Sequence, residues 1–317
     1  MPEVITFGET MVSMIPTEIG HLRYIPNFRR KMGGAESNVA IALTRLAHPA
    51  GFVTAFGEDA LGRYAYSELL SEGLDLSRVA FDPEHRTGVM FKELLGKYET
   101  KVWYYRENSA ASHMTASLLD TEYLKSAKIL HVTGITMAIS QTARQAVLDA
   151  VAKAKALGLF ISFDPNIRLR LWSKEEAAKA ILPLLPEVDI VFPGLEESEI
   201  LFGPGSVEEY IEKYLKLGIK KVALKVGKKG CYVADGQGTH FLEAYPFFDV
   251  VDTVGAGDAF DSGFLAGLLE GQSLTECGTM ANCMGAMATK SSDDYQMLPT
   301  RRELDVLLQK APPLPDR

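Results

Sequence analysis

The sequence predicts an α/β fold in which helices cover both faces of a mostly parallel central sheet and a small second β-sheet forms a lid. From residue 128 onward, short apolar runs alternate with segments of helical periodicity, the order typical of a parallel sheet. Two extended patches, at residues 11–32 and 85–112, interrupt this alternation and could pair with each other apart from the main sheet. The chain has 317 residues, 47% of them hydrophobic, which is enough to bury a large core.

The first part of the chain is expected to contribute to both sheets. Its core elements are predicted as a strand at 4–7, a helix around 39–47, a strand at 52–56 and a helix at 61–70. The extended lid segments are 11–15, 22–32, 87–95 and 101–106. We therefore predict a core made of residues 1–10, 33–84 and 113–317, into which residues 11–32 and 85–112 are inserted as the lid.

The rest of the chain alternates regularly. Strands are expected at 129–132, 159–163, 188–192 and 221–226, with helices at 142–157, 174–185, 195–202 and 207–217. A hairpin over 231–234 and 239–242 follows, then an apolar strand at 247–251 and helices at 260–269, 274–289 and 302–308. Open sheets of this class bind ligands beyond the carboxyl ends of their strands, so residues that follow strands are the functional candidates.

One such stretch is Asp-Thr-Val-Gly-Ala-Gly-Asp-Ala-Phe at residues 252–260. Gly255 and Gly257 would let a ligand approach the backbone closely, and the N–H groups of the first helical turn would bind an anion. Asp258 in the same turn suits a base that takes the proton from a hydroxyl attacking a phosphate. Taken alone, the stretch is equally compatible with a tight turn in which Asp258 caps a helix.

Two motifs together point to a family. Residues 252–260 resemble the second signature of the PfkB, or ribokinase-like, family of sugar kinases, and Gly-Gly-Ala-Glu-Ser-Asn at residues 33–38 resembles the first. The resemblance extends from about Val4 to Leu308 and implies a ribokinase-like fold. It also implies that Asp258 is the catalytic base and that Gly255, Ala256 and Gly257 supply the anion hole.

The first signature lies on the sugar side of such a site. The resemblance implies that Gly33 and Gly34 contact the sugar and that Asn38 borders the same pocket, while Asp258 faces the sugar from the second signature. A side chain at either glycine would obstruct a bound ligand. The alternative is a plain turn with Asn38 near the start of a helix.

Arginine residues narrow the range of possible substrates. Tyr104 and Arg106 are two residues apart on a strand-like segment and should project to one face, and Arg168 follows a predicted strand. A guanidinium holds a carboxylate with two parallel hydrogen bonds, so this set favours a sugar acid. The surrounding patterns resemble 2-keto-3-deoxygluconate kinases, which implies a further contact from Asp294. Met90 stands where such relatives often have tyrosine, and both arginines could instead be surface charges.

The nucleotide side is predicted from the resemblance alone. The residues implied to lie along ATP are Lys225, Gly227, Gly230, Gly255, Gly257 and Asn282, with Asn282 near the base. Lys228 and Lys229 could equally be a solvated turn.

The resemblance also implies two cations. Glu197 would bind Mg²⁺ through water, although Gly194 stands where the family usually has asparagine. Mg²⁺ would screen the phosphate charge. Asp252 would border a monovalent cation such as K⁺, or serve only as a cap.

Composition excludes several other functions. The net charge of −8 and the pI of about 5.4 argue against binding to nucleic acid or to an anionic membrane surface. The three cysteines are too few for a disulfide framework, no Cys/His set has zinc spacing, and no Gly-x4-Gly-Lys-Ser/Thr motif occurs. No apolar run is long enough to span a membrane. We therefore expect a cytoplasmic protein.

Taken together, the motifs predict an ATP- and Mg²⁺-dependent kinase for the primary hydroxyl of a sugar acid, with 2-keto-3-deoxygluconate converted to its 6-phosphate. A kinase for fructose or ribose is the nearest alternative, and a non-catalytic sugar-sensing protein of the same fold is another. Exposed lid edges are often covered by a neighbouring subunit, which predicts a homo-oligomer through the lid.

Overall fold

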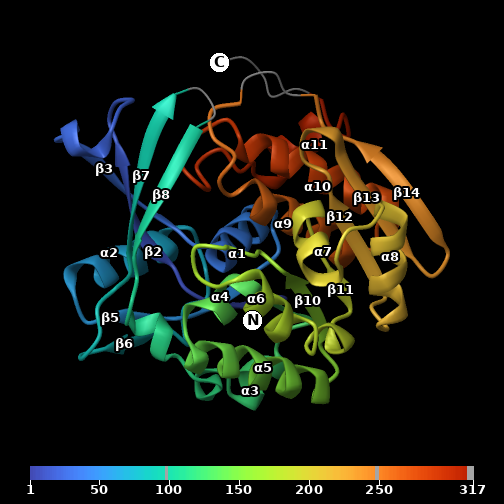
Figure 1. Ribbon diagram of the computed structural model, residues 1–317, viewed down its shortest axis with the longest axis horizontal. Coiled ribbons are helices and arrows are strands. Elements are labelled where there is room, and N and C mark those ends of the chain that lie inside the picture. Colours follow the sequence, from blue (N-terminus) through green and yellow to red (C-terminus); the bar gives the residue numbers. More distant parts are fainter. Residues whose placement is uncertain (97–98, 247–249, 313–317) are drawn as a thin grey trace.

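The computed structural model describes residues 1–96, 99–246 and 250–312, and its centre is a large twisted sheet (Figure 1). The strand order is β14-β13-β12-β11-β10-β9-β1-β4. The strands from β12 to β4 run parallel, and the hairpin β13–β14 adds an antiparallel edge. Their bounds are β1 Val4–Phe7, β4 Ala50–Val53, β9 Ile129–Thr133, β10 Phe160–Asp164, β11 Ile190–Val191, β12 Lys221–Lys225, β13 Gly230–Asp235 and β14 Gly238–Glu243.

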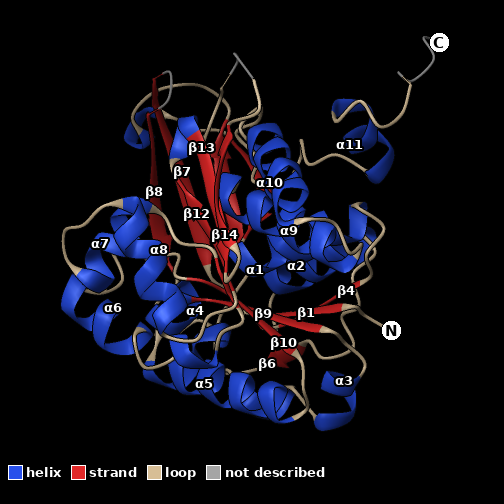
Figure 2. Ribbon diagram, turned by 90° about the vertical axis from the view of Figure 1, so that its right-hand side faces the viewer, coloured by secondary structure: helices blue, strands red, loops and turns tan. Residues whose placement is uncertain are grey.

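Helices cover both faces of this sheet (Figure 2). Neighbouring residues of one strand, such as Val4 and Ile5, belong to opposite hydrophobic clusters because successive side chains in a strand point to opposite faces. One cluster includes side chains of α3 Thr121–Lys125, α4 Gly134–Ile139, α5 Gln141–Ala156, α6 Lys174–Ile181, α7 Leu195–Phe202 and α8 Val207–Lys216. The other includes side chains of α1 Ala35–Arg45, α2 Ala60–Ser71, α9 Ala256–Leu269, α10 Leu274–Ala288 and α11 Arg301–Leu307.

A separate sheet forms the predicted lid. Its order is β3-β2-β7-β8, with β2 and β7 parallel and the outer pairs antiparallel. The bounds are β2 Met11–Pro16, β3 Phe28–Gly33, β7 Val89–Gly96 and β8 Glu99–Tyr105, close to the predicted lid segments. In Figure 1 this sheet stands beside the main one. The core sheet with helices on both faces and the small second sheet are therefore confirmed, and the exact division into two units stays a prediction.

Local details differ from the sequence expectation. The expected strand at 52–56 is split between β4 of the main sheet and β5 Ala55–Gly57, which pairs with β6 Ala80–Asp82. Helix α4 was not predicted. Of the strand expected at 247–251, residues 247–249 lie outside the described residues and Val251 is not in a strand. Instead, the N–H groups of Val251 and Asp252 bond to the Thr289 carbonyl at the end of α10.

In the described ranges, no helix combines the length and apolar character needed to cross a membrane.

Candidate active site

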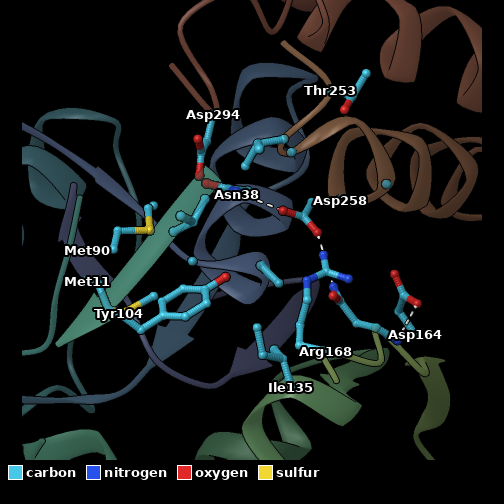
Figure 3. Close-up of a pocket in the computed structure, with 18 of the residues that line it drawn as sticks. Met11, Asn38, Met90, Tyr104, Ile135, Asp164, Arg168, Thr253, Asp258 and Asp294 are labelled. Atoms are coloured by element: carbon cyan, nitrogen blue, oxygen red, sulfur yellow. Dashed lines mark hydrogen bonds between the residues drawn. The ribbon is translucent and has the colours of Figure 1, made fainter. Parts of the chain in front are cut away.

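A cavity of about 410 Å³ lies between the lid strands and the carboxyl ends of the core strands (Figure 3). The lid contributes a mainly apolar wall of Met11, Met90, Val102 and Tyr104. Gly33, the last residue of lid strand β3, also lines the cavity. The core contributes most of the polar residues and the other glycines. Its lining residues are Gly34, Ala35, Asn38, Ile135, Asp164, Asn166, Arg168, Glu197, Lys225, Thr253, Val254, Gly255, Gly257, Asp258 and Asp294.

Asp258 lies in the first turn of α9 and faces this cavity. Asn38 donates a hydrogen bond from Nδ2 to its Oδ2 at 2.7 Å, and Asn166 donates to its Oδ1 at 3.5 Å. Burial raises the pKa of Asp258 to about 6, with the hydrogen bond from Asn38 opposing that rise and the charge of Asp164 adding to it. A carboxylate with such a pKa is suited to accept a proton near neutral pH.

The backbone around the start of α9 leaves donors free. Gly255 has φ = 84°, the left-handed region that favours glycine, and a Cβ there would lie 2.7 Å from the Asp294 carbonyl oxygen. The N–H of Ala256 bonds to the Thr253 carbonyl at 3.3 Å, whereas those of Gly257 and Asp258 have no acceptor among the described residues. Free N–H groups in this turn are what an anion hole requires. Donor roles for Gly255 and Ala256 stay predictions.

A second cavity, of about 330 Å³, adjoins the first and shares Lys225, Thr253 and Gly257 with it. Its other lining residues are Gly227, Lys228, Gly230, Ala244, Tyr245, Val250, Ala256, Phe260, Asn282, Gly285, Ala286 and Thr289. Five of the six predicted nucleotide residues thus line this cavity, whereas Gly255 lines the first one. The two cavities meet at the start of α9. Such a pair can hold two substrates with their reacting ends at the anion hole.

Asn282 lines this second cavity, but its amide nitrogen already makes hydrogen bonds within the protein. Its Nδ2 donates to the carbonyl oxygens of Leu242 and Glu243, at 3.3 and 2.9 Å. Only the amide oxygen remains for a nucleotide base, so a contact of Asn282 with the base stays a prediction.

Acidic residues surround Lys225 where the cavities meet. Its Nζ lies 2.8 Å from Asp164 Oδ2 and 3.4 Å from Asp261 Oδ1. Burial opposes ionisation of Asp164, but the ammonium of Lys225 outweighs it and lowers the pKa of that carboxyl. Asp261, with one buried oxygen that lacks a partner among the described residues, has its pKa raised by burial.

Glu197 lines the first cavity, but both its oxygens also accept backbone hydrogen bonds. Ile167 N–H donates to Oε1 at 2.8 Å and Gly194 N–H to Oε2 at 2.7 Å, the latter as a cap of α7. No group of three or more His, Cys, Asp or Glu side chains in the described parts of the chain is arranged to hold a metal. One or two cavity carboxylates nevertheless suit Mg²⁺, which keeps several waters and binds mainly through substrate phosphates.

The predicted sugar residues come together. Gly33, Gly34, Asn38, Tyr104, Arg168 and Asp294 all line the first cavity. Gly34 is required by a close backbone approach, because a Cβ there would overlap the Glu9 carbonyl oxygen. The amide oxygens of Asn38 and Asn166 are buried without a partner among the described residues, so they could accept hydrogen bonds from sugar hydroxyls.

Arg106 departs from the expectation. It does not line the cavity, and its buried guanidinium pairs with Glu9, with Nε 2.6 Å from Oε2. The reason is that β8 ends at Tyr105, so the alternation assumed for residues 104 and 106 is broken. The guanidinium lies 5.5 Å from the centroid of the Tyr104 ring, and its Nη1 is buried without a partner in the described structure. A substrate contact by Arg106 stays a prediction.

Asp252 has a partner that the sequence did not predict. Its Oδ2 lies 3.1 Å from Nζ of Lys92, a fully buried lysine of β7. The residues around Asp252 therefore do not fit a free monovalent cation, because an ammonium already contacts the carboxylate.

Sequence reasoning did not single out Lys92, and it placed Asn166 among the strand-exit residues of the expected ligand edge without giving it a role. Asn166 follows the strand exit at Asp164, and its φ of 39° is rare for a residue other than glycine, but only the fold places its amide beside Asp258. Lys92 lies in an alternating lid strand, where a lysine is ordinarily expected to face solvent.

Comparison with known proteins places these features in a family. The model of the pfkB family carbohydrate kinases matches residues 1–301. The chain is 38% identical to the 2-dehydro-3-deoxygluconokinase of Bacillus subtilis (strain 168) over 304 residues, covering 95% of this chain and 94% of that protein. It is 37% identical to Fructokinase-1 of Zea mays over 322 residues, covering 97% and 98%.

A solved structure shares the fold. The crystal structure of a fructokinase double mutant from Vibrio cholerae O395, in a fructose, ADP and potassium ion bound form, matches with a TM-score of 0.86 and 29% identity. The match covers 97% of this chain and 98% of that chain. The predicted ribokinase-like fold is confirmed, and the chain belongs to the pfkB family of carbohydrate kinases.

Proposed function

We propose that this kinase transfers the γ-phosphoryl group of ATP to a primary hydroxyl of a sugar acid, converting 2-keto-3-deoxygluconate to its 6-phosphate. The observation that best supports the chemistry is the setting of Asp258. It combines a pKa near 6, burial, and a place on the helical turn whose free N–H groups lie where two cavities adjoin. Membership of a kinase family speaks against the non-catalytic sugar sensor.

The geometry supports the following course of reaction. Asp258 accepts the proton of the sugar hydroxyl while its oxygen forms a bond to the γ-phosphorus and the bond from that phosphorus to the bridging oxygen of ADP breaks. Asn38 and Asn166 hold the carboxylate toward the hydroxyl. The N–H groups of Gly257 and Asp258 stabilise charge on the transferred group. The lid wall would limit access of water, which competes as an acceptor.

Mg²⁺ bound together with ATP supplies screening of the phosphate charge. Glu197 and Asp164 line the cavity beside Lys225 and are the residues that would hold this ion, through water in the case of Glu197.

Two features support an acidic sugar. Arg168 lines the cavity, and in Figure 3 its guanidinium points toward Asp258 from the floor of the site. The Arg106 guanidinium lies 5.5 Å from the centroid of the Tyr104 ring, which lines the cavity, and its Nη1 is buried without a partner among the described residues. A guanidinium can hold a carboxylate with two hydrogen bonds, which a neutral sugar cannot exploit. Fructose remains the alternative, because the fructokinase of Zea mays is about as similar as the 2-dehydro-3-deoxygluconokinase.

A substrate panel tests this proposal. Sugar-dependent ADP release is measured with 2-keto-3-deoxygluconate, gluconate, fructose and ribose, for the wild type and for Arg168→Ala and Arg106→Ala. We expect Arg168→Ala to lower kcat/KM for the sugar acid by roughly 10²-fold, the loss of a charged hydrogen-bonded pair. Activity on neutral sugars should change little.

The control is Arg302→Ala, an exposed arginine in the first turn of α11, which should leave all activities unchanged. A preference for fructose or ribose that survives both arginine substitutions would refute the sugar-acid assignment while leaving the kinase chemistry intact.

We also infer a homo-oligomer through the lid. Phe91 packs edge-on against Phe28 and Tyr105 on one face of the lid sheet, and Tyr105 is 67% exposed. Exposed aromatic clusters of this kind are typical of subunit contacts. Light scattering measures the assembly, and a monomer at every concentration would contradict it.

The buried cysteines Cys231, Cys277 and Cys283 are free thiols, which supports a reducing, cytoplasmic location.

A further inference from the structure

Lys92 has an environment that the catalytic scheme above does not use. It belongs to lid strand β7, yet its side chain is fully buried against the core. Its Nζ lies 2.7 Å from Asp294 Oδ1, 2.8 Å from the Ser292 carbonyl oxygen and 3.1 Å from Asp252 Oδ2. Two of these partners lie between α10 and α11, and the third lies just before α9, so one ammonium joins the lid to two core segments.

The charges show why this ammonium stays in place. A carboxylate buried without a partner is costly, and here a single cation lies between two of them. Burial alone would lower the pKa of Lys92, but the charges of Asp294 and Asp252 outweigh it and raise that pKa above its usual value. Lys92 therefore carries its charge throughout the working pH range.

Both partners of Lys92 connect directly to the active site. Asp252 accepts a second hydrogen bond at Oδ1 from Val254 N–H, at 3.3 Å, in the segment that leads to the anion hole. Asp294 lines the sugar cavity, and its carbonyl oxygen closely faces the left-handed Gly255. If the ammonium moved, Asp252 in the segment before α9 and Asp294 in the cavity wall would both lose their contact with it.

We propose that Lys92 is a positioning residue: its lid-borne ammonium takes the place of a free monovalent cation beside the anion hole, so that turnover needs no added K⁺. The inference rests on the proposed phosphoryl transfer at Asp258 but not on the identity of the sugar. The related fructokinase was solved with a potassium ion. In this chain the residues around Asp252 already contain a cation of their own.

The first test uses the wild-type enzyme. Sugar-dependent ADP release is measured with tetramethylammonium as the only monovalent cation and then with K⁺ added at constant ionic strength. We expect a change of no more than about twofold, the size of a residual screening effect. Clear activation by K⁺ would overturn the proposal. Absence of turnover in both buffers and on every sugar would instead count against the proposed function.

The second test removes the ammonium. Lys92→Met should lower kcat by roughly 10²-fold, the effect expected when residues around a reacting group are misplaced, with a smaller change in the KM for ATP. K⁺ or NH₄⁺, but not the larger tetramethylammonium, should restore at least part of the loss. A purely structural lysine would show no such selective rescue. A folded Lys92→Met enzyme with normal kcat, or with a loss that no small cation repairs, would refute the proposal.

A matched control is Lys31→Met. Lys31 belongs to the neighbouring lid strand β3 and pairs with Asp293 at 3.6 Å, next to Asp294, but its side chain is one-third exposed. Its loss should leave kcat unchanged and create no response to K⁺.

Thermal unfolding gives a readout that does not depend on activity. K⁺ should raise the Tm of Lys92→Met and leave the Tm of the wild type unchanged, because only the variant has a vacant cation position. Equal K⁺ responses of the two proteins would contradict the proposal. If Lys92→Met does not fold, the response of wild-type activity to K⁺ decides whether the proposal holds.

Discussion

At the scale of single residues, the active site depends on how burial changes the properties of carboxyl groups. Asp258 has a pKa of about 6 because it is removed from water, and the hydrogen bond from Asn38 keeps that pKa from rising further. Asp164, in direct contact with Lys225, has its pKa lowered although it is also buried. Neighbouring aspartates thus differ in role, with Asp258 suited to accept a proton and Asp164 suited to remain charged.

Asp258→Asn tests the assignment of the base. The amide is close in shape and its oxygen can still accept from Asn38, so binding of both substrates should persist. Turnover should fall by about 10²- to 10⁴-fold, the usual contribution of a general base. Steady-state kinetics and a sugar-binding titration check this, with Asp149→Asn on the exposed face of α5 as the control. Normal turnover would remove Asp258 from the mechanism.

The pH profile follows from the same residue. A base with a pKa of about 6 is protonated below that pH, so kcat/KM should fall as pH decreases through 6. The raised pKa has the opposite effect on stability. The folded state binds the proton more tightly than the unfolded state, so the contribution of Asp258 to stability is lost as pH rises from about 4 to 6.

Glu36 is a second buried carboxyl group that titrates in the pH range of the kcat/KM profile, because burial raises its pKa to about 7. Its Oε1 accepts hydrogen bonds from Thr133 and Thr136, and it does not line the cavity. Glu36→Gln should therefore leave the acid limb of the kcat/KM profile near pH 6. A limb that moves with this substitution would show that Asp258 does not set it.

At the scale of elements, helix α9 is held in place by close packing against α10. A Cβ on Gly263 would lie 2.8 Å from the Met280 carbonyl oxygen and 2.9 Å from Ala281 Cα. The absence of a side chain lets the two helices approach. This contact sets the position of the first turn of α9, and with it Asp258 and the anion hole.

Gly263→Ala should therefore destabilise the protein by about 1–3 kcal/mol, the cost of overpacking a core. Chemical denaturation measures this change in the free energy of unfolding. Gly236→Ala is the matched control, since a Cβ there would meet nothing within 4 Å. An unaltered free energy of unfolding in Gly263→Ala would show that the helices can separate at no cost.

At the scale of the whole molecule, the site exists only where the two sheets face each other. The lid supplies Tyr104 and Met90, α1 supplies Asn38, the segment after β10 supplies Asn166 and Arg168, and α9 supplies Asp258 (Figure 3). Lys92 crosses from the lid into the core. The cavity is therefore lined by the lid and the core together.

The sequence alone predicted the alternating core, the separate lid sheet and the strand-exit glycines and carboxylates around Asp258, because these depend on local periodicity and on backbone requirements that neighbouring residues reveal. Only the tertiary structure decided that Arg106 turns to Glu9, that Asp252 receives the ammonium of Lys92, and that Asn166 reaches Asp258. Local spacing shows which residues of one element share a face. The partner of a buried charge depends on how elements distant in sequence pack. A charge removed from water without an opposite charge beside it costs free energy, so the packing that pairs the charges is favoured.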